Sequence, residues 1–110
     1  MKIKVGCDLV EIRRFNNIDR AVLSKLFHKS ELRSLKAETL AGMFAMKESC
    51  KKVFNDLDWL DIEIKREKTG KPILNFKKLL EGRVLSYDVS ISHDAGYAIA
   101  VVVFLINDEH

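Results

Sequence analysis

The chain of 110 residues has few of the residues that bend, cross-link or loosen a protein: one proline, two cysteines and five glycines. This composition excludes a disordered or fibrous protein, and the spacing of Cys7 and Cys50 excludes a usual zinc site. No apolar run reaches the roughly 20 residues that span a bilayer, and the N-terminus lacks the apolar part of a secretory signal. We therefore expect one cytoplasmic domain over residues 1–110, with both cysteines as buried free thiols.

A strong charge of one sign is also absent. The 19 basic and 16 acidic residues leave a net charge of +3, spread along the chain rather than clustered with aromatic residues. This pattern argues against nucleic acid as a partner. It is compatible with an anionic ligand or with an acidic protein, and we expect no membrane partner.

Strand and helix patterns fill most of the chain. Residues 38–54 are expected to form a long helix, whose core-facing residues recur at spacings of three and four: Met43, Met46, Cys50 and Val53. Alternation or apolar runs predict strands at residues 2–10, 61–66, 73–76, 87–93 and 97–105, and helical segments at residues 11–27, from Ser30, and at 77–80. The fold class is therefore α+β, with an antiparallel sheet packed on a long central helix.

The first and last strands carry further expectations. In residues 2–10 the apolar set is expected to face the core, so that Asp8 projects to the other side and Gly6 leaves room there for a ligand. Residues 97–106 are apolar at every position, which predicts that both faces of this strand are covered. One layer of helices covers a single face, so the second face points to a partner subunit.

Asp8 and Glu48 are the first candidates for chemistry, because each is an acid among apolar or small residues. A carboxylate in such surroundings needs a cation, a hydrogen bond or a proton, so two of them on different elements predict a divalent-metal site. A structural alternative stays open, in which Asp8 caps a turn and Glu48 pairs with Lys52 one helical turn later.

Nearby basic residues can serve a ligand or simply face solvent. Lys52 shares a helix face with Glu48 and is the better candidate for a phosphate ligand, whereas Lys47 and Lys51 are expected on a solvated face. His93 is either a core histidine or, at the mouth of a hairpin beside Ser92, a residue that faces a ligand.

Four stretches, in the right order, resemble the holo-acyl-carrier-protein synthases, the small class of 4'-phosphopantetheinyl transferases. The resemblance rests on the acid of the first stretch, on Lys-Glu followed by a lysine four residues after that Glu, and on Ser-x-Ser-His. The matching stretches are residues 5–14 (VGCDLVEIRR), 40–54 (LAGMFAMKESCKKVF), 61–64 with 70–72, and 90–103 (SISHDAGYAIAVVV).

The resemblance implies transfer of the phosphopantetheine arm of coenzyme A to a serine of apo acyl carrier protein, with release of adenosine 3',5'-bisphosphate. It implies that Asp8 and Glu48 hold Mg²⁺ and that these acids and Lys52 are catalytic. Glu48 is also our candidate for the base that takes the serine proton. The residues implied in coenzyme A binding are Lys52, Lys71, Pro72, Ser92 and His93.

The resemblance also implies a homotrimer with sites between subunits, in agreement with the doubly apolar last strand. Two arginines in the first helical region, Arg13 and Arg14, are implied in docking the acidic carrier protein; from the residues alone they could equally serve solubility.

Two departures from the family pattern bear on coenzyme A. Met43 stands where many members carry arginine, and residues 55–60 contain no glycine where members have a glycine-rich loop. Contacts of that loop with coenzyme A are then missing or supplied differently. Two alternatives follow: a relative that binds coenzyme A or a carrier protein without modifying it, and an oligomeric interaction module whose carboxylates are structural.

Overall fold

The structure, a computed structural model, describes residues 1–76, 80 and 82–108. Its strands are β1 (Lys2–Glu11), β2 (Ile62–Arg66), β3 (Pro72–Phe76), β4 (Val84–Asp94) and β5 (Tyr97–Ile106). Its helices are α1 (Arg20–Leu26) and α2 (Ala37–Val53), with short 3₁₀ turns η1 (Ile12–Phe15), η2 (Lys29–Arg33) and η3 (Trp59–Asp61). The helix predicted at residues 77–80 lies largely outside the described residues.

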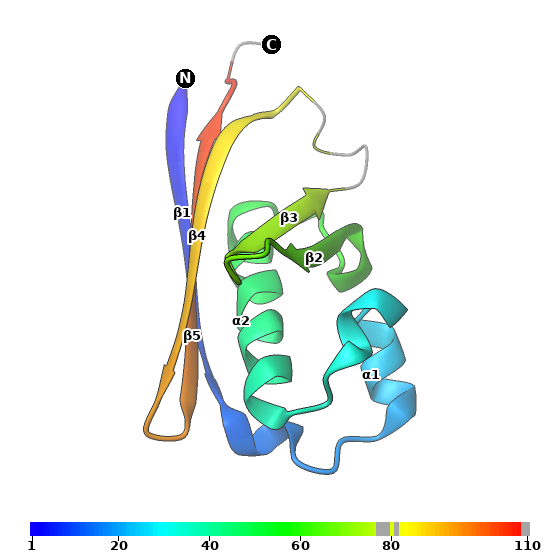
Figure 1. Cartoon of the computed structure of the whole chain (residues 1–110). Coiled ribbons are helices and arrows are strands. Elements are labelled where there is room, and N and C mark those ends of the chain that lie inside the picture. The colour runs from blue at the N-terminus through cyan, green and yellow to red at the C-terminus, as the bar shows by residue number, and fades with distance from the viewer. Residues whose placement is uncertain (77–79, 81, 109–110) are drawn as a thin grey trace.

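Two antiparallel sheets flank the longest of these helices. One has three strands in the order β1-β5-β4, and the other is the hairpin β2-β3. Figure 1 shows the three-stranded sheet as one layer, with α2 packed along one of its faces and α1, β2 and β3 on the far side of α2. The α+β class and the antiparallel sheet are thus confirmed, and the helix predicted over residues 38–54 is found at Ala37–Val53.

The turn between β4 and β5 follows from two residues in the left-handed region. Ala95 has φ of 51° and Gly96 has φ of 83°, as in a two-residue turn whose twist matches the strands it joins. The Gly96 carbonyl also accepts a hydrogen bond of 2.9 Å from the Ile12 amide, which fixes the start of η1 against this turn.

Helix α2 is buried on more than one side, because the sheet and the β2-β3 side both cover it. The predicted core residues Met43, Met46 and Cys50 are buried, as are Ala41 and Ala45 on a neighbouring face. A helix with this much buried surface gains most of its stability from packing rather than from intrinsic propensity.

The orientation predicted for β1 is wrong. Gly6 is buried against α2, and a Cβ atom built on it would lie 2.0 Å from the Ser49 carbonyl oxygen. The space beside Asp8 is therefore occupied by the helix backbone rather than left for a ligand. Ile3, Val5 and Leu9 point the other way and are 70%, 65% and 60% exposed. The apolar set faces away from α2, so polarity alone indicated the wrong side as the core.

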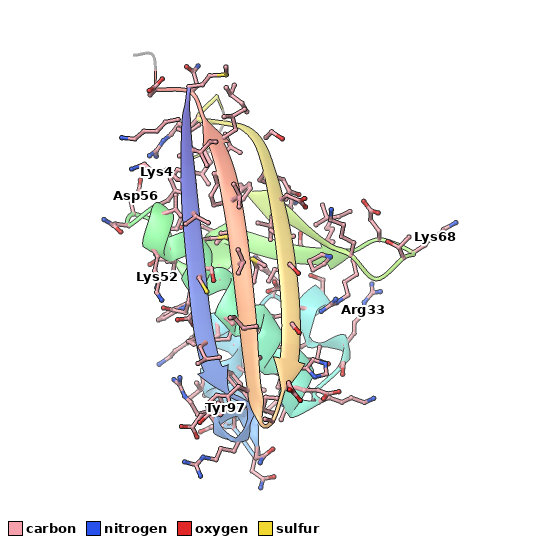
Figure 2. The ribbon with its side chains drawn as sticks, turned by 90° about the vertical axis from the view of Figure 1, so that its left-hand side faces the viewer. Lys4, Arg33, Lys52, Asp56, Lys68 and Tyr97 are labelled. Carbon is pink, nitrogen blue, oxygen red and sulfur yellow. The ribbon has the colours of Figure 1, made fainter. Side chains whose placement is uncertain are left out.

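This exposed side of β1 continues across β5. Together they form what we name the outer apolar face, made of Ile3, Val5, Cys7, Leu9, Tyr97, Ile99, Val101, Val103 and Leu105. Figure 2 looks onto this face, with Tyr97 at its lower end. Cys7 is exposed here, so only Cys50 of the two cysteines is buried as expected. On β5 the other set of side chains, including Ala100 and Phe104, is buried.

Among the described residues, no helix has the length and apolar character to cross a membrane.

Candidate functional site

Asp8 and Lys52 meet where α2 lies on β1. The Lys52 ammonium donates to the Asp8 carboxylate over 3.0 Å and to the Cys7 carbonyl over 2.8 Å. Gly6 makes this contact possible, because its missing side chain lets the α2 backbone approach β1 at Ser49. The side chain of Asp8 is 18% exposed and that of Lys52 is 55% exposed, so the pair sits at the edge of the protein where a ligand can reach it.

Glu48 lies one helical turn before Lys52 and has different partners. The indole N–H of Trp59 donates to Glu48 Oε1 over 2.6 Å, and the Lys51 ammonium lies 3.8 Å from the same oxygen. The structural alternative predicted from spacing is therefore wrong in its partners, since the carboxylate that pairs with Lys52 is Asp8. Lys51 is not on a fully solvated face either, because its ammonium stands 3.8 Å from the centre of the Trp59 ring.

The two acids offer oxygen ligands that suit a hard cation. Each has one oxygen engaged, Asp8 Oδ1 by Lys52 and Glu48 Oε1 by Trp59. Within the described part of the chain, no group of three or more His, Cys, Asp or Glu residues is placed to hold a metal. Two carboxylates fit Mg²⁺, which commonly takes one or two protein carboxylates and completes its shell with water and phosphate oxygens.

Lys47 is fully buried, so the prediction of a solvated position is wrong. Its ammonium donates to Glu31 Oε1 over 2.6 Å and to the carbonyls of Leu26 and Trp59 over 2.9 and 3.0 Å. Burial lowers the pKa of Lys47, and the Glu31 carboxylate opposes that effect. The Glu31 carboxylate also accepts from the backbone amides of His28 and Ile64, which satisfies this buried network.

Ser92 and His93 lie near the end of β4 that leads into the turn to β5, and their side chains are on opposite faces of the strand. His93 is opposite Ala98 on the α2 side, and Ser92 is opposite Ile99 on the outer side. The His93 side chain is 53% exposed and its Nδ1 lies 3.8 Å from Glu38, so the core-histidine alternative is wrong. Because β5 separates β4 from β1, His93 and Asp8 sit on different outer strands of the sheet.

The remaining predicted residues lie elsewhere on the surface. Lys71 precedes β3 and pairs over 2.8 Å with Asp88, whose carboxylate raises the pKa of Lys71, and Pro72 begins β3. Arg13 and Arg14 are exposed in η1, where Arg13 pairs with Glu11 and Arg14 lies over the Phe44 ring. Among the described residues of the single chain, no contact joins any of these four residues to Asp8.

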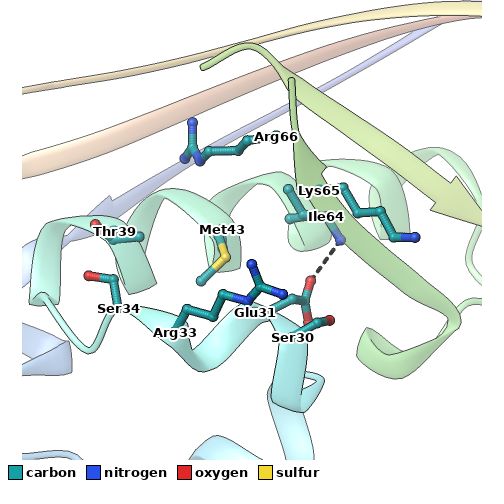
Figure 3. Close-up of a pocket in the computed structure, with 9 residues that line it drawn as sticks. All are labelled: Ser30, Glu31, Arg33, Ser34, Thr39, Met43, Ile64, Lys65 and Arg66. Atoms are coloured by element: carbon teal, nitrogen blue, oxygen red, sulfur yellow. Dashed lines mark hydrogen bonds between the residues drawn. The ribbon is translucent and has the colours of Figure 1, made fainter. Parts of the chain in front are cut away.

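A pocket of about 490 Å³ opens between η2, the first half of α2 and the end of β2. Figure 3 shows Met43 within it, flanked by the guanidinium groups of Arg33 and Arg66. Glu31 also lines this pocket, but its carboxylate is paired with Lys47. The full lining is Ser30, Glu31, Arg33, Ser34, Thr39, Met43, Ile64, Lys65 and Arg66. We name it the basic pocket; its charge and hydroxyl groups suit an anion.

The fold and these groups define an α+β protein with a carboxylate-lysine site at one edge of its sheet and a basic pocket beyond the other. The chain belongs to the 4'-phosphopantetheinyl transferase superfamily, whose sequence profile matches residues 4–102. It is 34% identical to the holo-[acyl-carrier-protein] synthase of Nautilia profundicola, covering 92% of this chain and 98% of that protein. It is also 34% identical to the synthase of Helicobacter pylori, covering 96% and 99%.

Solved structures agree with this membership. The crystal structure of the Helicobacter pylori synthase in complex with coenzyme A has a TM-score of 0.84 and 34% identity, covering 93% of this chain and 100% of that chain. The crystal structure of the Bacillus anthracis synthase in complex with CoA (3',5'-ADP) has a TM-score of 0.77 and 28% identity, covering 91% of this chain and 93% of that chain.

The sequence interpretation missed Trp59 and the buried role of Lys47. A signal for Lys47 was available, because it follows Met43 by four residues and precedes Cys50 by three, which places it on the core-facing side of the helix. Trp59 stood in a segment predicted only as a connection, and no local pattern linked it to Glu48.

Proposed function

We propose that this protein transfers the 4'-phosphopantetheine arm of coenzyme A to a serine of apo acyl carrier protein. The observation that carries the proposal is the contact of Asp8 with Lys52, one helical turn from Glu48, in a chain of this superfamily. The relatives named above are holo-acyl-carrier-protein synthases, and the similar Helicobacter pylori structure is a complex with coenzyme A. We infer that residues 1–110 form one transferase domain that acts in the cytoplasm.

The proposed reaction joins the serine oxygen of the carrier to the phosphorus next to the pantetheine arm. The bond from that phosphorus to the bridging oxygen breaks, and the departing adenosine 3',5'-bisphosphate takes the electron pair. Glu48 accepts the serine proton, directly or through water. Lys52 neutralises charge on the pyrophosphate, and its exposed ammonium can exchange Asp8 for phosphate.

Mg²⁺ held by Asp8 and Glu48 would add positive charge to the leaving group. In the protein alone, the Lys52 ammonium neutralises the Asp8 carboxylate. If Asp8 held the cation instead, the Lys52 ammonium would be free to contact the phosphates of the substrate.

The basic pocket is proposed to bind a phosphate of coenzyme A. Met43 stands where many relatives carry an arginine. Arg33 from η2 and Arg66 from β2 bring two guanidinium groups to the same place. A guanidinium group can donate two parallel hydrogen bonds to a phosphate, so Arg33 and Arg66 are suitable replacements for the arginine of those relatives. Lys71, Pro72, Ser92 and His93 are proposed to contribute to coenzyme A binding as well.

A homotrimer is also proposed, with the outer apolar face at its centre. Figure 2 shows Lys52 beside β1 and Arg33 beyond β4, so the two parts of the proposed site lie at opposite edges of the sheet. A ring of copies in which the β1 edge of one meets the β4 edge of the next would join them. The exposed arginines Arg13 and Arg14 are proposed to dock the acidic carrier protein.

Mass spectrometry of the carrier tests the function directly. Apo carrier protein is incubated with coenzyme A, Mg²⁺ and this protein, and we expect the carrier to gain one phosphopantetheine. Glu48→Gln should abolish the gain without unfolding the protein. Absence of any gain, with measurable coenzyme A binding, would favour a relative that binds without modifying; near-normal transfer by Glu48→Gln would remove Glu48 from both of its proposed roles.

A further inference from the structure

Trp59 is the only tryptophan of the chain, and its indole N–H reaches the proposed catalytic acid. The donor-acceptor distance to Glu48 Oε1 is 2.6 Å, which is short for a hydrogen bond from nitrogen. An indole N–H can only donate, so this contact engages one of the two carboxylate oxygens, Oε1.

Two groups, Trp59 and Lys51, meet at the same oxygen of the Glu48 carboxylate and also contact each other. Trp59 donates to Oε1, Lys51 lies 3.8 Å from Oε1, and the Lys51 ammonium stands 3.8 Å from the centre of the Trp59 ring. A cation over an indole face is attracted by the ring, so Lys51 and Trp59 stabilise each other while both hold the carboxylate. Oε2 is the oxygen left to a metal ion.

Trp59 is itself held from behind by buried groups. Its carbonyl oxygen accepts a hydrogen bond of 3.0 Å from Lys47, whose ammonium is also fixed by Glu31 and by the Leu26 carbonyl. The next carbonyl, that of Leu60, lies 2.9 Å from His28 Nε2. Residues 55–60 contain no glycine, and these contacts hold the end of that segment in one conformation.

We infer that Trp59 is a positioning residue that holds Glu48 ready to bind the metal ion through Oε2, and that buried Lys47 fixes Trp59 in turn. The inference rests on the proposed function. Hydrogen-bond donors behind a metal ligand fix its orientation, and losing one commonly costs 10- to 100-fold in metal affinity or activity. Lys51 lies 3.8 Å from the same oxygen, beyond hydrogen-bond distance, so among the described residues Trp59 supplies the hydrogen bond that orients the Glu48 carboxylate.

Trp59→Phe is the decisive variant, because it removes the N–H donor and keeps an aromatic ring beside Lys51. We expect the Mg²⁺ concentration for half-maximal transfer to rise about tenfold, with most of kcat recovered at saturating Mg²⁺. By calorimetry, coenzyme A should bind the variant more weakly in the presence of Mg²⁺ and as tightly as wild type in the presence of a chelator. Tyr87→Phe is the matched control, because it removes a half-buried donor that bonds Leu74 instead.

The wild-type protein offers a second measurement that does not depend on the variant folding. Because Trp59 is the sole tryptophan, its emission should change when Mg²⁺ is titrated in the presence of coenzyme A, and Glu48→Gln should suppress that change. An active wild type whose Trp59 emission stays constant through the titration overturns the inference, as does a folded Trp59→Phe with the wild-type Mg²⁺ requirement. Failure of the wild type to modify carrier protein is a different result, which overturns the proposed function.

Discussion

Lys47 and Glu31 form an ion pair of 2.6 Å in which neither side chain is exposed to solvent. The pair ties α2 to η2, and through further hydrogen bonds it reaches the Trp59 carbonyl and the Ile64 amide in the middle of β2. A buried ion pair of this kind contributes little over apolar residues of equal volume, but removing one partner leaves a buried charge without compensation.

Lys47→Ala should therefore lower the free energy of unfolding by about 3–5 kcal/mol, because the Glu31 carboxylate keeps its burial and loses its cation. Urea denaturation followed by circular dichroism measures the change. Lys51→Ala on the same helix is the control and should cost less than about 1 kcal/mol, since its side chain is partly exposed. Equal costs for the two variants would contradict the buried pairing.

Gly6→Ala should be strongly destabilising because its Cβ would lie 2.0 Å from the Ser49 carbonyl oxygen, which belongs to helix backbone and cannot move aside alone. We expect a loss of more than about 2 kcal/mol. Gly70→Ala is the control: its φ of +88° disfavours a side chain, but nothing lies within 4 Å, so its cost should stay near 1 kcal/mol. Thermal denaturation of both variants compares them, and a smaller loss for Gly6→Ala would be inconsistent with close packing of α2 on β1.

These contacts show what the sequence could and could not predict. The long periodic helix and the hairpin at His93 to Gly96 follow from patterns of residues near one another in the chain. The side of β1 that faces α2 could not be predicted from such patterns. The residues of the outer apolar face have the composition of a core, so the alternation of apolar and polar residues indicated the wrong side. The site was predictable in its residue types but not in its pairings: Asp8 with Lys52, and Glu48 with Trp59, are contacts between distant segments.

The Cys50 thiol makes the stability of the fold sensitive to alkaline pH. Burial raises its pKa from 9.0 to about 12. Above pH 9 the unfolded chain loses this proton while the folded chain keeps it, so the free energy of unfolding falls between pH 9 and 12. Urea denaturation from pH 8 to 10.5 should show a steeper loss for the wild type than for Cys50→Ala, by up to about 1.4 kcal/mol per pH unit. Parallel pH dependences of the two proteins would show that Cys50 does not contribute.

Arg33 and Arg66 should govern coenzyme A binding through the basic pocket. Replacing both by alanine removes two guanidinium groups from beside Met43, so we expect KM for coenzyme A to rise at least tenfold and kcat to change less. The fold should be retained, because both side chains are exposed and the hydrogen bond from Arg66 to the Gly70 carbonyl also lies at the surface. Arg20→Ala/Lys25→Ala removes the same charge from exposed positions of α1 that do not line the pocket, and it is the control. A double variant with wild-type KM for coenzyme A would exclude the pocket as a phosphate site.

The outer apolar face should hold the proposed trimer together. Val103 lies in the middle of this face opposite Val5, and it is 38% exposed in the single chain. Val103→Asp would bury an unpaired carboxylate between copies, so the trimer should dissociate to monomers, and transfer should fall with it if the site is completed between copies. Val22→Asp places the same change on α1, at a residue that is 42% exposed, and should leave both properties intact. Light scattering gives the mass of each protein; a trimer that survives Val103→Asp, or a wild type of monomer mass, would show that this face has another role.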